Sequence, residues 1–199
     1  MSRRAELQIA DIAPSGSTSG AYALVLSEVS GSRRLPIVIG GTEAQAIAIE
    51  LEKMTPSRPL THDLFRSLAQ SYNIAIEEVY IYNLVEGIFY ARIVANLDGH
   101  QIEIDARTSD AVAIAVRFNC PIYCEDFILE QAGVSAEEAA AEMQGTDEEV
   151  DLEELTAVED PEKLSVDELQ RQLDQALERE EYEKASRLRD EIQKRSSGK

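Results

Sequence analysis

Two patterns of apolar and polar positions alternate along the first two-thirds of the chain. Apolar residues at every second position, in short runs bounded by Gly, Pro or Ser, predict half-buried strands. Apolar residues at three- and four-residue spacing predict helices between them. The predicted strands are a segment around Leu7 and Ile9, two runs at 22–29 and 34–39, and three runs at 79–84, 89–97 and 101–106.

The turns between these runs predict how the strands pair. Ser30-Gly31-Ser32 separates the second and third runs and indicates a hairpin. Glu86-Gly87 and Asp98-Gly99 separate the last three runs, and acid-Gly pairs between alternating segments are strong short-range hairpin signals. We therefore expect a three-stranded antiparallel meander, followed by a short strand at Pro121–Tyr123.

Four helices are expected around these strands. Thr42 is a candidate N-cap, with Gln45 completing a capping box, for a helix that stops before Pro56. A second helix opens at Thr61 and carries an apolar stripe. Its members are Leu64, Leu68 and Tyr72.

The third and fourth helices complete the predicted domain. The third covers Asp110–Phe118, is rich in Ala and Val, and is capped by Thr108 or Ser109, while the last covers Glu125–Gln131. Together the patterns predict an α+β fold, with a mainly antiparallel sheet and three or four packed helices.

The charge distribution separates this domain from the C-terminal third of the chain. The chain has 38 acidic and 19 basic residues, a net charge of −19, and the stretch from Ser135 to Glu162 has 12 acidic residues and no basic one. A helix can begin at Ser135 with Glu138 in a capping box, but we expect most of the stretch to be a solvated acidic tether. A chain this acidic repels nucleic acid at long range, so nucleic-acid chemistry requires a local basic site or a bridging cation.

Helical periodicity returns in the tail beyond the acidic stretch. Ser165 and Glu168 form a capping box at its start, and two apolar stripes of about three turns each come after it. Helices this short are marginal alone, so we expect them to pair as a hairpin and to offer apolar surface to a protein partner. The predicted partner-binding residues are Leu173, Leu177, Tyr182, Ala185 and Leu188.

Other composition features narrow the class of protein. No apolar region follows the N-terminal arginines and no run approaches the roughly 20 residues of a membrane span, so we expect a cytoplasmic protein without membrane contact. Cys120 and Cys124 are too few for a disulfide framework and lack the partners of a structural zinc site, so both are expected to be buried. His100 follows a hairpin turn and is expected to be exposed and inert.

Four sequence blocks, in order, resemble the bifunctional nuclease domain, a bacterial and plant family. They are Leu35-Pro-Ile-Val-Ile-Gly40 followed by Glu43-Ala-Gln-Ala-Ile47; Arg58-Pro-Leu-Thr-His-Asp-Leu64; Phe89-Tyr-Ala-Arg-Ile93; and Glu103-Ile-Asp-Ala-Arg-Thr-Ser-Asp-Ala111. One departure is Thr108, where members of the family usually have proline. The resemblance implies DNase and RNase activity and self-association into a homo-oligomer.

The tail from Leu164 to about Lys194 resembles the UVR motif, the helical hairpin through which excision-repair nuclease subunits touch each other. Its signature here is Leu177-Glu-Arg-Glu-Glu-Tyr-Glu-Lys-Ala185 leading to Arg187-Leu-Arg-Asp-Glu-Ile192. A nuclease-type domain followed by this hairpin is an arrangement the family itself shows. The predicted organisation is a bifunctional-nuclease-like domain at 1–134, an acidic linker at 135–162 and a hairpin at 163–195.

The resemblance assigns no catalytic residues, so the candidate site comes from chemistry. Phosphodiester hydrolysis needs an activated water, charge stabilisation on the phosphoryl oxygens and protonation of a leaving oxygen, often with divalent metals held by carboxylates. The predicted catalytic residues are His62, Asp63, Asp105 and Asp110. The predicted phosphate-binding residues are Arg58, Arg107 and Ser109. The predicted ligands of Mg²⁺ or Mn²⁺ are Glu43, Asp63, Asp105 and Asp110.

Each candidate also has a structural interpretation. Acidic residues in the first turn of a helix are common capping and dipole devices. Asp105 and Arg107, two apart on one strand, can form an ion pair that orders the loop, and His62 can bond a neighbouring carbonyl. Three meander tyrosines could stack on bases, but without interleaved Lys or Arg the pattern favours packing. They are Tyr80, Tyr82 and Tyr90.

Two functions therefore stay open. The family resemblance favours a metal-assisted nuclease acting on DNA and RNA, with a hairpin for a protein partner. The net charge of −19 and the missing basic groove favour a non-catalytic adaptor or regulator whose hairpin recruits a partner. The nuclease requires acidic and imidazole groups from three helix starts and one strand end to meet at one place.

Overall fold

A computed structural model describes residues 3–15, 20–143, 169–171, 173, 188–189 and 192–193 of the chain. The chain divides into two compact units, Met1–Thr156 and Ala157–Lys199, and each is described by itself. Within the described ranges, no helix is both long enough and apolar enough to cross a membrane.

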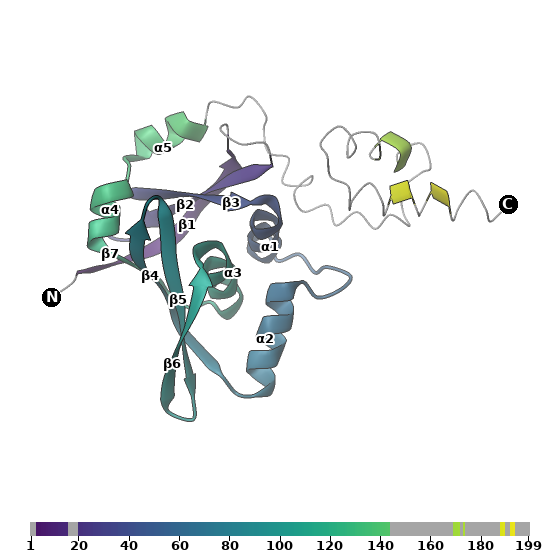
Figure 1. The fold of residues 1–199 in the computed structure, drawn as a ribbon, viewed down its shortest axis with the longest axis horizontal. Coiled ribbons are helices and arrows are strands. Elements are labelled where there is room, and N and C mark those ends of the chain that lie inside the picture. Colours follow the sequence, from purple (N-terminus) through teal and green to yellow (C-terminus); the bar gives the residue numbers. More distant parts are fainter. Residues whose placement is uncertain are drawn as a thin grey trace. The chain divides into compact units, whose positions relative to one another are not determined.

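One seven-stranded sheet forms the centre of the first unit (Figure 1). Its strands lie in the order β3-β2-β1-β7-β4-β5-β6. Neighbouring strands are antiparallel except β4 and β7, which run parallel. The strand bounds are β1 Arg4–Pro14, β2 Ala21–Glu28, β3 Arg34–Gly40, β4 Ala75–Val85, β5 Ile88–Leu97, β6 His100–Arg107 and β7 Ile122–Glu125. The predicted hairpin and meander are confirmed, and the short β7 joins them into one sheet.

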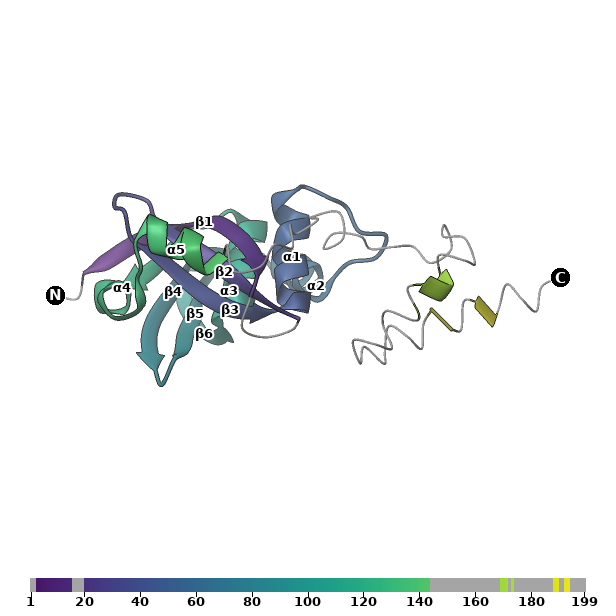
Figure 2. The ribbon, with the colours of Figure 1, turned by 90° about the horizontal axis from the view of Figure 1, so that it is seen from above.

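Helices pack on this sheet in an α+β arrangement, as the sequence predicts. Their bounds are α1 Gly41–Leu51, α2 Thr61–Ser71, α3 Thr108–Phe118, α4 Asp126–Ala132 and α5 Ala136–Met143. α3 packs against β4 and β5 and lies beside α1, and α2 packs against α3. α4 and α5 lie towards the end of the unit that is opposite α1 and α2 (Figures 1 and 2).

The main core lies between α1, α3 and one face of the sheet. Alternate strand residues point into it, including the fully buried Leu24 and Leu26 of β2 and Val79 and Ile81 of β4. The core-facing residues of α3 are Ala, Val and Ile, and small side chains let a helix approach a sheet closely. Alternation therefore fixes which face each strand presents to the helices.

On the opposite face of the sheet, arginine side chains pack on two tyrosines of the meander. Tyr80 lies between two guanidiniums, Arg4 at 4.1 Å and Arg92 at 4.8 Å from its ring centroid. Its hydroxyl donates a hydrogen bond to Glu125. Burial, as the larger cause, and this hydrogen bond, as the second, raise the pKa of Tyr80 to about 12. Arg92 also lies 5.2 Å from the ring centroid of Tyr82. The arginines that contact these tyrosines come from β1 and β5. They engage Tyr80 and Tyr82 in packing contacts.

The three helices nearest the candidate residues begin at positions that the sequence predicts only in part. α2 begins at Thr61 as predicted, but the N-cap of α1 is Gly40 rather than Thr42. The N-cap of α3 is Arg107 rather than Thr108 or Ser109. With these starts, each helix has an acidic residue at the third helical position. These residues are Glu43, Asp63 and Asp110.

The predicted apolar stripe of α2 faces solvent rather than the core. Leu64, Leu68 and Tyr72, here named the α2 outer strip, are 65%, 56% and 66% exposed. Ala69 is buried, and the ring of Phe65 meets that of Phe118 of α3 edge-on at 6.5 Å. The predicted helix is confirmed. The side of it that packs on α3 has only two apolar residues, Phe65 and Ala69, among several polar ones.

The helix predicted to begin at Ser135 is present as α5. The Ser135 amide donates to Glu138 Oε2 at 2.8 Å, and the Glu138 amide donates to Ser135 Oγ at 3.2 Å. This reciprocal pair is the capping box seen in the sequence. α5 occupies the beginning of the predicted linker, and the rest of that linker lies outside the described residues.

In the second unit, apolar residues of two helical segments pack together. Leu169 and Leu188 are buried, and Leu173 and Ile192 pack against them. Leu188 is only 4% exposed, so it belongs to the interior of this unit rather than to a free surface. The other predicted partner-binding residues, Leu177, Tyr182 and Ala185, lie outside the described residues.

Candidate functional site

The starts of α1, α2 and α3 and the end of β6 bring four polar side chains together. Arg107 Nη2 donates to Glu43 Oε1 at 2.7 Å, and Arg107 Nε donates to Asp110 Oδ2 at 2.7 Å. A further bond of 3.1 Å joins Arg107 Nη2 to Asp110 Oδ1, and His62 Nε2 lies 3.1 Å from the same oxygen. We name Glu43, His62, Arg107 and Asp110 the Arg107 cluster.

Local backbone geometry explains how Glu43 reaches Arg107. The Glu43 carboxylate folds back over the start of its own helix, so that a Cβ at Gly40 would lie 2.5 Å from Glu43 Oε2. Only a residue without a side chain leaves this space. Arg107 leaves the strand as the N-cap of α3, and this position lets its guanidinium reach Asp110 three residues later.

The cluster is open to solvent on one side. The side chain of Arg107 is 68% exposed, whereas those of Glu43, His62 and Asp110 are half-buried. Burial acts to raise the pKa of Asp110, but hydrogen bonds from Arg107 and His62 outweigh it and hold that pKa below its ordinary value. The same carboxylates raise the pKa of Arg107. The cluster therefore holds an accessible cation against two carboxylate side chains.

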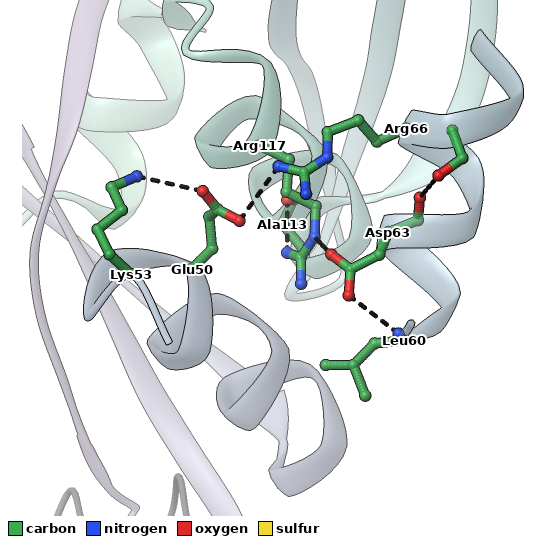
Figure 3. Close-up of polar contacts among 8 residues, drawn as sticks. Glu50, Lys53, Leu60, Asp63, Arg66, Ala113 and Arg117 are labelled. Atoms are coloured by element: carbon green, nitrogen blue, oxygen red, sulfur yellow. Dashed lines mark hydrogen bonds and ion pairs between the residues drawn. The ribbon is translucent and has the colours of Figure 1, made fainter. Parts of the chain in front are cut away.

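Asp63, predicted to join this site, instead binds a buried arginine (Figure 3). Arg117 Nε of α3 donates to Asp63 Oδ1 at 2.8 Å, and the Leu60 amide donates to Asp63 Oδ2 at 2.9 Å. Burial acts to raise the pKa of Asp63, but these two bonds leave it lowered. Both carboxylate oxygens are thus engaged at the start of α2.

Two further contacts lie near Arg117, and the one made by Arg66 ties α2 to α1. Arg66 Nη1 lies 3.4 Å from Glu50 Oε2, and Lys53 Nζ lies 3.1 Å from Glu50 Oε1 (Figure 3). We name these residues, with Asp63 and Arg117, the Arg117 network. Arg117 and Glu50 were not predicted as site residues. Arg117 follows Asp110 by seven residues, and Glu50 follows Glu43 by seven. Each therefore lies two turns further along the same side of its helix.

Asp105 lies apart from the cluster. It is exposed on β6, with Oδ1 3.5 Å from the Tyr82 hydroxyl. The predicted ion pair between Asp105 and Arg107 does not form, because Arg107 turns towards Glu43 and Asp110 at the start of α3.

The remaining phosphate-binding candidates also lie apart. Arg58 is exposed in the connection between α1 and α2 and forms no ion pair with any described residue. Ser109 is buried in the first turn of α3, next to Thr108, whose Oγ1 donates to the Phe89 carbonyl at 3.3 Å. Arg107 is therefore the predicted phosphate ligand that the cluster presents to solvent.

The arrangement does not provide a ready-made metal site. The four predicted ligands divide between the Arg107 cluster, the Arg117 network and the surface of β6, and no group of three or more His, Cys, Asp or Glu suited to a metal occurs among the described residues. Within the cluster, the Arg107 guanidinium binds both carboxylates. A divalent cation would have to displace it, so the Mg²⁺ or Mn²⁺ requirement stays a prediction.

A separate groove of about 640 Å³ lies at the C-terminal ends of α1 and α3. Leu51, Val116 and Cys120 contribute to its lining. Burial raises the pKa of the Cys120 thiol to about 11 and that of Cys124 to about 12, so neither is an activated nucleophile. As predicted, Cys124 is buried, while Cys120 is half-buried.

Comparison with known proteins identifies both units. Residues 24–137, more than half of the chain, match the bifunctional nuclease domain family, and residues 163–194 match the UvrB/uvrC motif. Two uncharacterized proteins of Mycobacterium tuberculosis, MT1877 of strain CDC 1551 / Oshkosh and Rv1829 of strain H37Rv, are each 48% identical over 111 residues. Each match covers 56% of this chain and 66% of the relative, just under two thirds. The chain thus belongs to the bifunctional nuclease domain family and carries a UvrB/uvrC motif near its C-terminus.

Proposed function

We propose that the chain cleaves phosphodiester bonds of DNA and RNA at the Arg107 cluster. The proposal rests on one observation, that an imidazole, a carboxylate and an accessible guanidinium are in direct contact. His62 Nε2 lies 3.1 Å from Asp110 Oδ1, and Asp110 is bound by Arg107. A base, a group that orients it and a cation for the phosphate are the parts such chemistry requires.

In the proposed reaction, His62 moves the proton. The Asp110 carboxylate can only accept at its contact with His62 Nε2, so the neutral imidazole carries its hydrogen there and leaves Nδ1 as the basic nitrogen. Nδ1 takes a proton from the attacking water as its oxygen bonds phosphorus. The bond to the leaving oxygen breaks, and that oxygen takes a proton from solvent water. Asp110 stabilises the imidazolium formed in this step.

Arg107 binds the substrate phosphate in this proposal. Its fork-shaped guanidinium suits two phosphate oxygens at once. Because Arg107 also binds Glu43, substrate phosphate competes with the Glu43 carboxylate for Nη2. This competition weakens phosphate binding and accords with a chain whose net charge is −19.

The test is cleavage of labelled single-stranded DNA and RNA by highly purified protein, with Mg²⁺, with Mn²⁺ and with EDTA. We expect cleavage that the His62→Ala variant, purified in parallel, lacks. Activity abolished by EDTA would support the metal-assisted form of the reaction, and retained activity would support the metal-free form. Equal cleavage by both proteins would show that the activity does not depend on His62 and would overturn the proposal.

Gly40 offers a way to move Glu43 without removing it. A Cβ in Gly40→Ala would push the Glu43 carboxylate away and weaken its hold on Arg107. We expect tighter phosphate binding, seen as a several-fold lower KM for an oligonucleotide, with stability within about 1 kcal/mol of the wild type. Gly41→Ala is the matched control, since its Cβ meets its nearest atoms at 3.4 Å, an ordinary contact. An equal effect of both variants on KM would contradict this prediction.

A second candidate function, a non-catalytic adaptor, is favoured by the acidic charge and by the UvrB/uvrC motif. Affinity capture by the wild type and by a Leu169→Asp variant tests it. Leu169 packs with Leu188 inside the second unit, so a buried carboxylate there disrupts the hairpin. A partner lost by this variant, together with no cleavage above background, would favour the adaptor.

The α2 outer strip supports the expected homo-oligomer. Its three apolar side chains are accompanied by exposed Thr61, Ser67 and Ser71, so this side of α2 carries no charge. We expect Leu64→Glu with Leu68→Glu to lower the molar mass measured by light scattering to that of a monomer. Stability should change by less than about 0.5 kcal/mol, because the substituted side chains are exposed. Val38→Glu, at an exposed valine of β3, is the control, and an unchanged mass in the double variant would contradict the prediction.

A further inference from the structure

Arg117 is the most deeply buried charged group of the described residues. Its side chain is 0% exposed. Nε donates to Asp63 Oδ1 at 2.8 Å and Nη1 donates to the Ala113 carbonyl, one turn earlier in α3, at 3.0 Å (Figure 3). The third nitrogen, Nη2, is buried and has no hydrogen-bond partner. The guanidinium is therefore fixed relative to α3, but at the cost of one unsatisfied donor.

This arrangement is a poor way to stabilise a fold. Burying an ion pair removes two charges from water, and well-packed apolar side chains of similar volume often do as well. An orphaned donor adds a further penalty. A role in geometry accounts for the residue better than a role in stability.

The position of α2 depends on polar contacts to an unusual degree. Ala69 is its single buried residue, and apart from Phe65 its large apolar side chains face outward in the outer strip. Besides Phe65 against Phe118, the first turns of α2 meet α3 through two polar contacts, Asp63 with Arg117 and His62 with Asp110. Because apolar packing on this helix is limited, directional polar contacts help to fix it, and the ion pair between Asp63 and Arg117 is the more deeply buried of the two.

The ion pair between Asp63 and Arg117 joins the two helices that carry His62 and Asp110, the proposed acid–base pair. Asp63 directly follows His62, and its second oxygen holds the Leu60 amide, so its carboxylate is locked to the first turn of α2. Arg117 lies two turns after Asp110 on α3. The bond between Asp63 and Arg117 thus connects the helix that carries the imidazole with the helix that carries its carboxylate.

We propose that Arg117 is a positioning residue: by holding Asp63, it fixes the start of α2 and keeps His62 within hydrogen-bond distance of Asp110. Its consequence for catalysis rests on the proposed function. Its consequence for the contact between His62 and Asp110 does not, and can be measured in the absence of any substrate.

The composition of the chain makes that measurement clean. It has two histidines, His62 and His100, and His100 is exposed on β6. A hydrogen-bonded imidazole N–H exchanges slowly enough with water to give a proton–nitrogen cross-peak, whereas an exposed one does not. We expect one imidazole cross-peak for the full-length protein, assigned to His62 by its loss in His62→Gln.

Three variants separate positioning from stability. Arg117→Met removes the cation, Asp63→Asn keeps an oxygen for the Leu60 amide but removes the charge, and Asp126→Asn breaks an ion pair to Arg33 far from the site, 2.7 Å long in the native protein. We expect the His62 cross-peak to disappear in the first two variants and to remain in the third. The backbone amide spectrum of each variant reports whether it is folded.

Catalytic measurements supply the second readout. If the protein cleaves nucleic acid, Asp63→Asn should lower kcat about 10-fold or more with little change in KM, because Arg107 still meets the phosphate. A folded Asp63→Asn or Arg117→Met protein that keeps the His62 cross-peak overturns the positioning role. Absence of cleavage by the wild type overturns the proposed function alone, since the cross-peak experiment stands without it.

Discussion

Replacing His62 by alanine should lower the rate of oligonucleotide cleavage by roughly 10²–10⁴-fold, the usual contribution of a general base. The loss should appear in kcat, because Arg107 still presents its guanidinium to the substrate phosphate. Asp110→Asn should have a similar effect for a different reason. An amide can turn its NH₂ group to His62 Nε2, and this reverses the tautomer that the reaction needs.

The matched control for this prediction is His100→Ala. His100 is the other histidine of the chain and is exposed at the start of β6. Cleavage by His100→Ala should equal that of the wild type, and a loss of activity in both histidine variants would point to folding rather than catalysis. Full activity in folded His62→Ala would remove the imidazole from the mechanism.

The predicted strands agree closely with the fold, whereas the helices agree less well, and geometry explains the difference. Side chains alternate strictly along a strand, so runs such as 89–97 define their buried face by themselves. A helix turns by about 100° per residue, so its buried side depends on which neighbour it meets. For α2 that neighbour is the C-terminal half of α3, where Arg117 requires Asp63, and the helix therefore presents Leu64 and Leu68 to solvent.

The four members of the Arg107 cluster were predicted, but together with four residues that lie apart from it, and the pairing was not predicted. Glu43, Asp63 and Asp110 all occupy the third position of a helix, yet two of them turn to Arg107 and one turns to Arg117. Sequence spacing gives each carboxylate a place on its own helix. The choice of partner depends on the crossing of α1, α2 and α3, which no local pattern encodes.

Charge explains why the cluster and the acidic chain are compatible. Arg107 is held by Glu43 and Asp110, so it presents little net positive charge at a distance and attracts polyanions weakly. Under the proposed function, recognition of a phosphate at this site depends on close contact and on exchange of a carboxylate for a phosphate. Under the proposed function, a protein contact made by the second unit, with its UvrB/uvrC motif, would supply the encounter that long-range electrostatics does not.

Replacing Asp63 by alanine should destabilise the first unit by about 3–5 kcal/mol, the cost of leaving a buried charge without its partner. Arg117 is 0% exposed and would keep only the Ala113 carbonyl as an acceptor. Arg117→Met should cost less, because the half-buried Asp63 can still accept from the Leu60 amide and reach water. The double variant should therefore be more stable than Asp63→Ala alone, as urea unfolding of all four proteins would measure.

The ion pair between Asp63 and Arg117 should also make the stability difference between the wild type and Asp63→Asn depend on pH. The pKa of Asp63 is lowered in the folded protein from an ordinary value of 3.8, so its contribution is complete above that value and is lost as the pH falls through the lowered one. The stability gap between the wild type and Asp63→Asn should be constant from pH 7 to pH 5 and shrink below pH 3.8. A gap that stays constant into acid, or a double variant less stable than Asp63→Ala, would show that the bond between Asp63 and Arg117 does not carry this energy.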